Sequence, residues 1–230
     1  MSIWLIMGLV ILARFLVQSM LQSRFRKYSK EPLMNGMTGA DVARKMLYDN
    51  GIRDVEVSCI PGALTDHYNP QTRTVNLSEA VYNGSSVAAA AVAAHECGHV
   101  VQHACGYAPL RLRTALVPIV SFASNVVQWV LLAGVLFINV FPSLLWIGVA
   151  LFATTTLFSV VTLPVEVNAS SRAVNWLETS GIVNYETRLI AVDALRWAAY
   201  TYVIDAIASI ARLLYYLGLA RRDYNDGRNG

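Results

Sequence analysis

Charged residues are scarce in this sequence. Asp, Glu, Lys and Arg make up 14% of its 230 residues, whereas 55% of the residues are hydrophobic. A typical soluble domain is about 25% charged, so this composition excludes an ordinary soluble protein and indicates one that lives in a membrane. The net charge of +3 is spread around the edges of the apolar segments and forms no basic stripe. That pattern excludes nucleic acid as a partner.

Cysteine is also rare, and a cleavable signal is missing. Cys59, Cys97 and Cys105 are the only three cysteines, and we expect them to be free thiols, as in a reducing compartment. The first apolar stretch, residues 3–21, lacks the small-residue pattern at which a signal peptide is cut. We therefore predict that it is a retained membrane anchor.

Two further apolar stretches, 116–138 and 144–163, are each long enough to cross a bilayer. The short uncharged turn 139–143 joins them, which predicts a transmembrane hairpin. Basic residues follow the first span and precede the second: Arg24, Arg26, Lys27, Lys30, Arg111 and Arg113. Because Lys and Arg concentrate on the cytoplasmic side, both flanks and everything from Arg172 onward should be cytoplasmic. The sequence thus predicts an integral, multi-pass membrane protein.

The last apolar stretch, residues 189–219, allows two interpretations. It is long enough to cross, but it carries four charged residues: Asp193, Arg196, Asp205 and Arg212. A crossing would also leave basic residues outside. We favour a helix that packs on the protein's domain outside the membrane or lies at the membrane surface, and a fourth crossing is the alternative.

The segment His95-Glu96-Cys97-Gly98-His99 carries the chemistry. Histidines four residues apart share one face of a helix and can hold one zinc ion, while Glu96 between them stays free to act as a base. The context favours a helix, since Ser85 and Ser86 can cap it and an alanine- and valine-rich run leads into the motif. Cys97 points away from the metal-facing positions and is expected to pack in the core.

Residues before the motif predict a small α+β unit. Residues 40–49 have helical spacing, and 55–59 read as a strand. Residues 64–68 and 72–77 flank a turn and form a predicted β-hairpin. Residues 74–77 could be an edge strand that holds an extended peptide by backbone pairing, or the hairpin could be purely structural.

A catalytic zinc ion needs a third protein ligand. His103 shares the face of His95 and His99, but in a continuous helix it is about 12 Å from His95 along the axis. Glu166 is the better candidate, because the hairpin returns to the cytoplasmic side just before it and Pro164 suits a helix start there. The alternative is a glutamate that only stabilises the helix N-terminus.

These residues resemble a known family. The resemblance lies in the runs Leu64-Thr65-Asp66-His67-Tyr68-Asn69-Pro70, Leu77-Ser78, Val92 to Gln102, Leu163-Pro164-Val165-Glu166 and Thr201-Tyr202-Val203. They look like the YugP-type membrane zinc metallopeptidases, and the arrangement is more distantly similar to the HtpX-type membrane proteases. The resemblance implies a mostly helical α+β gluzincin fold with one catalytic zinc ion. Its ligands would be His95, His99 and Glu166, and its base would be Glu96. Many gluzincins have an aspartate four residues after the ligand glutamate, where this chain has Ser170, which could orient a ligand imidazole less strongly.

The predicted layout has four parts: an anchor with its basic flank (1–28), a catalytic half with the β-hairpin and the zinc-binding helix (29–113), the transmembrane hairpin (114–163), and a C-terminal helical half with the third ligand (164–230). The predicted function is a membrane-anchored zinc endopeptidase that hydrolyses peptide bonds of proteins, membrane proteins among them. His67 and Tyr68 are candidates for contacting the oxyanion or the substrate, and a structural role of His67 in its hairpin is the alternative.

Two other function classes compete with the peptidase. A zinc-binding membrane adaptor or scaffold would not need Glu96 as a base. A transporter would need ionisable groups at membrane depth, and the polar cluster of the second span has none.

Overall fold

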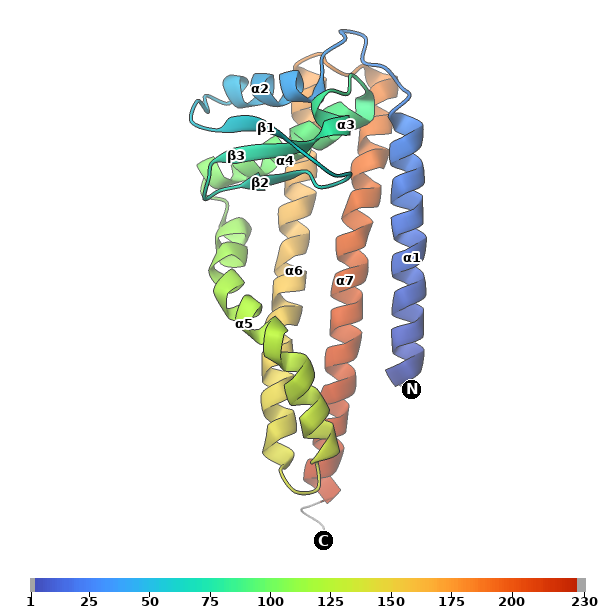
Figure 1. Ribbon diagram of the computed structural model, residues 1–230, viewed down its shortest axis with the longest axis vertical. Coiled ribbons are helices and arrows are strands. Elements are labelled where there is room, and N and C mark those ends of the chain that lie inside the picture. The colour runs from blue at the N-terminus through green and yellow to red at the C-terminus, as the bar shows by residue number, and fades with distance from the viewer. Residues whose placement is uncertain (1–2, 227–230) are drawn as a thin grey trace. The chain divides into compact units, whose positions relative to one another are not determined.

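The computed structural model describes residues 3–226, and side chains within residues 4–221. The described chain is mostly helical with one small sheet, which confirms the predicted α+β, mostly α class (Figure 1). Helices α1 (Ile3–Tyr28) and α2 (Gly39–Asp49) precede strands β1 (Glu56–Ile60), β2 (His67–Asn69) and β3 (Thr74–Ser78). Helices α3 (Glu79–Tyr82), α4 (Val87–Ala104), α5 (Ala108–Leu136), α6 (Pro142–Thr179) and α7 (Tyr185–Asp226) follow.

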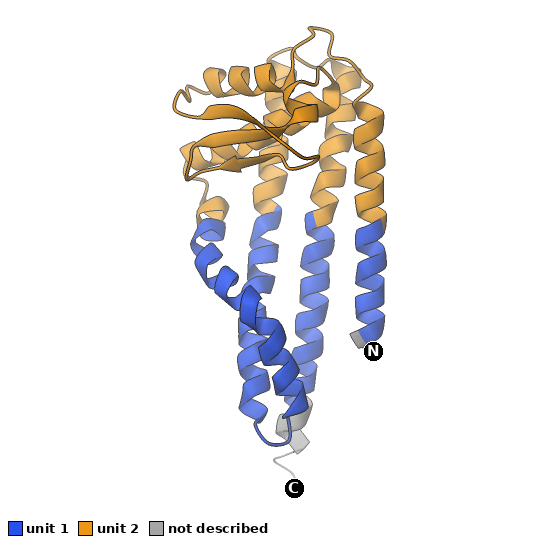
Figure 2. Ribbon diagram, viewed as in Figure 1, with its two compact units in different colours: residues 1–15, 112–163, 202–230 blue, residues 16–111, 164–201 orange. Residues whose placement is uncertain are grey.

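The chain divides into two compact units (Figure 2). Unit 1 comprises residues 1–15, 112–163 and 202–230, and unit 2 comprises residues 16–111 and 164–201. Unit 2 therefore contains the sheet, the motif helix α4 and the first part of α7, residues 185–201. Each unit has its own apolar core.

Unit 1 is built from apolar helices. Its core is small and includes Leu131 of α5 and Leu145 of α6. The two helices approach closely at Gly134, where an added Cβ would lie 2.7 Å from the Cα of Leu145. Small residues permit this kind of contact between membrane helices. A short turn joins α5 and α6 as predicted, but it spans residues 137–141 and not 139–143, since α5 ends at Leu136 and α6 begins at Pro142.

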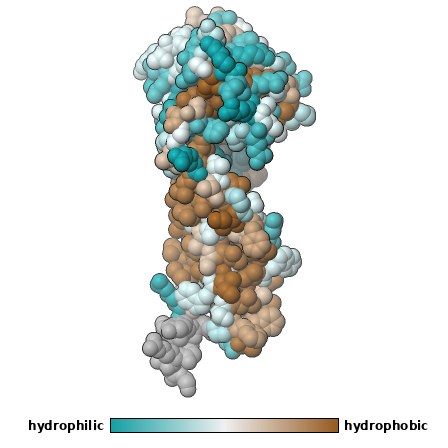
Figure 3. Space-filling view, turned by 90° about the vertical axis from the view of Figure 1, so that its left-hand side faces the viewer, coloured by the Kyte–Doolittle hydropathy of each residue, from teal (hydrophilic) through white to brown (hydrophobic). Residues whose placement is uncertain are grey.

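The surface of unit 1 is mostly apolar, and much of the face in Figure 3 is brown. Large side chains turn outward along its helices, among them Phe15, Phe122, Trp129 and Leu136. Among the described residues, four helices are long and apolar enough to cross a membrane: Trp4–Tyr28, Ala108–Leu136, Pro142–Thr179 and Tyr185–Arg221. These features mark the protein as a membrane protein, because such a surface needs an apolar surrounding.

Helix α7 is the fourth of these candidate spans, so a crossing, which the sequence interpretation did not favour, is open by length and composition. Two of its carboxylates are paired with α1. In unit 1, Arg14 binds Asp205 through Nη2 at 2.6 Å and Nε at 2.8 Å. In unit 2, the Tyr28 hydroxyl donates to Asp193 at 2.5 Å, with Arg24 3.4 Å from the same carboxylate. Pairing of this kind reduces the cost of charge in an apolar surrounding.

Unit 2 packs a three-stranded sheet against helices. Helix α2 begins at a capping box, in which the Thr38 side chain accepts from the Asp41 N–H and Asp41 accepts from the Thr38 N–H. It ends before Gly51, whose φ of +72° favours glycine. Both bounds agree with the predicted helix at 40–49. The apolar faces of α2, α4 and the sheet form the core.

The sheet order corrects one prediction. Strand β2 pairs antiparallel with β3, with Tyr68 opposite Val75, as expected for the hairpin. Strand β3 also pairs in parallel with β1 on its other side. Residues 74–77 therefore form the central strand and cannot be the edge strand that the sequence suggested. The edges are β1 and β2. The sequence did not reveal this order, because the pairing of β1 with β3 joins segments that are not neighbours in the sequence.

Helix α6 corrects a second prediction. Pro164 lies inside one continuous helix from Pro142 to Thr179 and does not begin a new one. Membrane helices tolerate an internal proline better than soluble helices do. Glu166 thus lies in mid-helix, which excludes a role in stabilising a helix N-terminus.

Candidate metal centre

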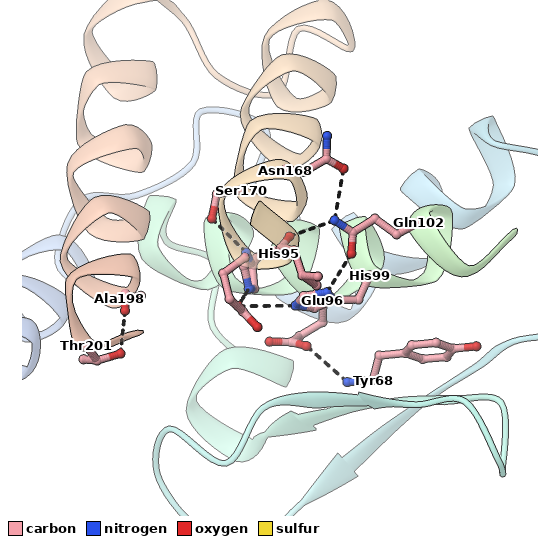
Figure 4. Close-up of polar contacts among 11 residues, drawn as sticks. Tyr68, His95, Glu96, His99, Gln102, Asn168, Ser170, Ala198 and Thr201 are labelled. Carbon is pink, nitrogen blue, oxygen red and sulfur yellow. Dashed lines mark hydrogen bonds and ion pairs between the residues drawn. The ribbon is translucent and has the colours of Figure 1, made fainter. Parts of the chain in front are cut away.

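The two motif histidines lie on α4. Its N-cap is Ser86, whose hydroxyl accepts from the Ala89 N–H. His95 and His99 are one turn apart, and their rings meet edge to face with centroids 4.8 Å apart (Figure 4). Their side chains are only 13% and 12% exposed. The helix therefore presents two nearly buried imidazoles at one point.

Glu166 of α6 completes this cluster. Its Oε2 lies 3.3 Å from His95 Nε2 and 3.6 Å from His99 Nε2. The three potential ligand atoms lie within 4.8 Å of one another, and the Glu166 side chain is 4% exposed. The structure thus brings together the three residues named from the sequence as zinc ligands. His103 is not part of this cluster, as the helix geometry predicted.

The close approach of α4 and α6 depends on Gly98. A Cβ at this position would lie 2.6 Å from the carbonyl oxygen of Ala169. Any side chain larger than hydrogen would therefore displace α6. Because Ala169 lies three residues after Glu166, the glycine inside the motif sets how near the carboxylate comes to the histidines.

Each imidazole has a polar partner on its other nitrogen. The Ser170 hydroxyl lies 3.1 Å from His95 Nδ1, and Gln102 Oε1 lies 3.1 Å from His99 Nδ1. Ser170 is one helical turn beyond Glu166, so both face the cluster. The sequence interpretation named Ser170 and missed Gln102, although Gln102 lies three residues after His99 on the same helical face.

Glu96 is held apart from the other three groups. It is 8% exposed, and its Oε2 accepts a hydrogen bond of 3.1 Å from the backbone N–H of Tyr68 on the edge strand β2. Figure 4 shows the Tyr68 backbone nitrogen turned toward Glu96, whereas the ring points away from it. The carboxylate between the histidines is therefore oriented by the sheet and remains outside the ligand cluster.

The side chains of the other two sequence candidates, Tyr68 and His67, have polar partners of their own. The Tyr68 hydroxyl is 3.0 Å from His103 Nδ1. His67 Nδ1 lies 2.8 Å from the Thr65 carbonyl oxygen, and its Nε2 lies 3.2 Å from the Asn76 amide. Both nitrogens of His67 are thus engaged within the hairpin, which favours its structural alternative. Thr201, which belongs to the last run that carries the family resemblance, donates to the Ala198 carbonyl of its own helix at 2.7 Å.

Burial and neighbouring charges shift the pKa values of three side chains near the cluster. Burial lowers the pKa of His99, but hydrogen bonding to Glu166 and the charge of Glu96 outweigh it, so the net pKa is raised. Burial, reinforced by Glu96, raises the pKa of the Cys97 thiol. Burial also raises the pKa of Tyr68. Cys97 is fully buried with its Sγ 3.6 Å from the Ala43 carbonyl oxygen, and it packs in the core as predicted.

The donor set fits zinc. Two imidazole nitrogens and one carboxylate oxygen, nearly buried and converging within one coordination sphere, are the ligand types of a catalytic zinc site with room for water. The contacts at both Nδ1 atoms are those by which proteins orient metal-binding imidazoles.

Comparison with known proteins agrees with this assignment. The model of a family described as "Putative neutral zinc metallopeptidase" matches residues 3–221. The "Putative membrane protease YugP" of Bacillus subtilis (strain 168) is 42% identical over 203 residues, which cover 88% of this chain and 89% of the relative. No solved structure matches the chain.

Proposed function

The chain belongs to the "Putative neutral zinc metallopeptidase" family, and from this membership we propose that it is a membrane-anchored zinc endopeptidase. The observation that carries the proposal is the convergence of His95, His99 and Glu166 beside a buried carboxylate, Glu96, that is not one of the three. A merely structural zinc site uses four protein ligands and has no need of such a group. This argues against an adaptor or scaffold.

His95 Nε2, His99 Nε2 and a Glu166 oxygen would hold one zinc ion. When bound, zinc supplies a Lewis acid for the peptide carbonyl and lowers the pKa of a coordinated water toward neutrality. Glu96 takes the proton of the attacking water as general base and returns it to the leaving amine as general acid. The Tyr68 N–H fixes one oxygen of Glu96 and so positions the carboxylate for both transfers.

The substrate class follows from the sheet edge and the membrane anchor. Strand β2 is an edge strand with its Tyr68 N–H at Glu96, so an extended peptide could lie along it. The basic flanks favour a catalytic unit at the cytoplasmic face of a bacterial cell membrane. We therefore propose protein or peptide substrates, including cytoplasmic segments of membrane proteins. The oxyanion donor is proposed to come from the β2 segment, where His67 and Tyr68 lie.

The test is metal analysis and a casein cleavage assay on detergent-purified wild type and Glu96→Gln. The amide is nearly isosteric with the carboxylate, so zinc content should stay unchanged. It cannot accept the proton, so the cleavage rate should fall by about 10²- to 10⁴-fold. Zinc-loaded Glu96→Gln that cleaves as fast as wild type would refute the proposed base.

A further inference from the structure

We propose that Gln102 is a positioning residue that holds His99 with its proton on Nδ1 and its Nε2 lone pair toward the metal centre. The inference rests on the proposed zinc site and goes beyond it, because it assigns a role to a residue outside the motif. Gln102 is a residue of α4, and its side chain is fully buried against α6. A buried amide must satisfy its donors and its acceptor within the protein.

The contacts of Gln102 fix which way its amide faces. Its Nε2 lies 2.7 Å from the Val165 carbonyl oxygen, which can only accept. The atom at this position must therefore be the NH₂ group. The same Nε2 donates to Asn168 Oδ1 at 3.0 Å (Figure 4). Arg172 Nε donates to that Asn168 oxygen as well, at 2.8 Å, which identifies it as oxygen because Arg172 can only donate.

The orientation of the amide then fixes the histidine. With the NH₂ group facing Val165 and Asn168, the atom 3.1 Å from His99 Nδ1 is the carbonyl oxygen Oε1. An acceptor at this distance needs an N–H on Nδ1. The neutral imidazole, which is the form that binds a metal, has only one proton, so in this form Nε2 carries the lone pair. Nε2 is the atom that faces Glu166 Oε2, 3.6 Å away.

His95 lacks a comparable constraint. Its Nδ1 contacts the Ser170 hydroxyl at 3.1 Å, and a hydroxyl can donate or accept. Ser170 is therefore compatible with either tautomer of His95, whereas Gln102 selects one tautomer of His99. The protein therefore fixes the tautomer of His99 and leaves that of His95 open.

The first test is ¹⁵N NMR of the histidine side chains in metal-free wild type in detergent. The chain has only four histidines, and His99→Gln identifies the signal of His99. The spectrum is recorded at mildly alkaline pH, where an ordinary imidazole carries a single proton. We expect a protonated Nδ1 and an unprotonated Nε2. A proton on Nε2 overturns the inference.

The second test is zinc affinity, measured by competition with a chelator, together with the melting temperature of each metal-free variant. Gln102→Met keeps the side-chain length but removes the acceptor, and should weaken zinc binding by about 10- to 100-fold. Gln102→Glu keeps an acceptor at His99, and its buried carboxyl in the neutral form can donate to the Val165 carbonyl oxygen, so the affinity should stay within a few-fold of wild type. The exposed Gln71→Met is the matched control and should bind like wild type.

The outcomes separate the inference from the proposed function. Unchanged affinity in Gln102→Met would overturn the positioning role. An equal loss in Gln102→Glu would also overturn it, because the effect would then come from the contacts with α6. If wild type bound no zinc at all, the proposed function would fail, while the NMR experiment would still decide the tautomer.

Discussion

Gly98 of α4 lies so close to Ala169 of α6 that a Cβ on the glycine would stand 2.6 Å from the Ala169 carbonyl oxygen. Two segments separated by about 70 residues are thus in backbone contact beside the metal centre. The glycine belongs to the histidine motif, yet its role is steric: it lets a second helix deliver Glu166.

Gly98→Ala should disrupt the metal centre without touching a ligand. The methyl group has to push α6 away, which should cost about 1–3 kcal/mol of stability and weaken zinc binding. Thermal unfolding and chelator competition measure the two effects. Gly218→Ala on α7 is the control, because nothing lies within 4 Å of a Cβ there. It should be neutral or stabilise the protein by up to about 1 kcal/mol. Equal behaviour of the two variants would contradict the steric role of Gly98.

The proposed ligand set makes a prediction about metal content. His95→Ala, His99→Ala and Glu166→Ala each remove one of three protein ligands and should lose most of the zinc, measured by elemental analysis. His103→Ala should retain it, because His103 contacts Tyr68 and lies outside the cluster. Zinc retained in Glu166→Ala but lost in His103→Ala would show that the third ligand is wrongly assigned.

The membrane topology can be tested by labelling introduced cysteines from each side of the membrane. Cys59 and Cys105 are exposed and are replaced by serine first. Cysteines at Ser29 and Ser180 should then react from the same side. Ser29 follows the first span and Ser180 follows the transmembrane hairpin, and the basic flanks favour the cytoplasm for both. Reaction from opposite sides would be incompatible with residues 95 and 166 sharing one site.

Cys97 should react differently from the other two cysteines with a thiol reagent. In the folded protein a thiol reagent should label Cys59 and Cys105 and leave Cys97 unreacted until the protein is denatured, because Cys97 is fully buried.

Burial also makes stability depend on pH through Cys97. Its folded pKa is raised above the unfolded value of about 8.5, so its contribution is complete below that pH and is lost above it. Each further pH unit should cost up to about 1.4 kcal/mol, as the unfolded state gains the thiolate. Denaturant unfolding between neutral and alkaline pH measures this slope. A Cys97→Ala variant should lose this part of the pH dependence, and an unchanged slope would contradict it.

Local sequence determined much of this protein. The alanine-rich run and its serine cap specify α4, and the spacing of His95 and His99 places both on one face, because helix geometry is set by neighbouring residues. The apolar stretches and their basic flanks likewise indicated membrane segments from length and charge alone. The α2 helix followed from its helical spacing and the β2–β3 hairpin from its turn residues in the same way.

The tertiary structure decided what joins distant segments. It made β3 a central strand by pairing it in parallel with β1, and it made α6 continuous through Pro164. It also revealed Gly98 against Ala169 and Gln102 between His99 and Val165. Composition and periodicity describe one element at a time, whereas these contacts depend on which faces of two elements meet. That choice is made by the packing of the whole core, and no residue pattern within a single helix or strand contains it.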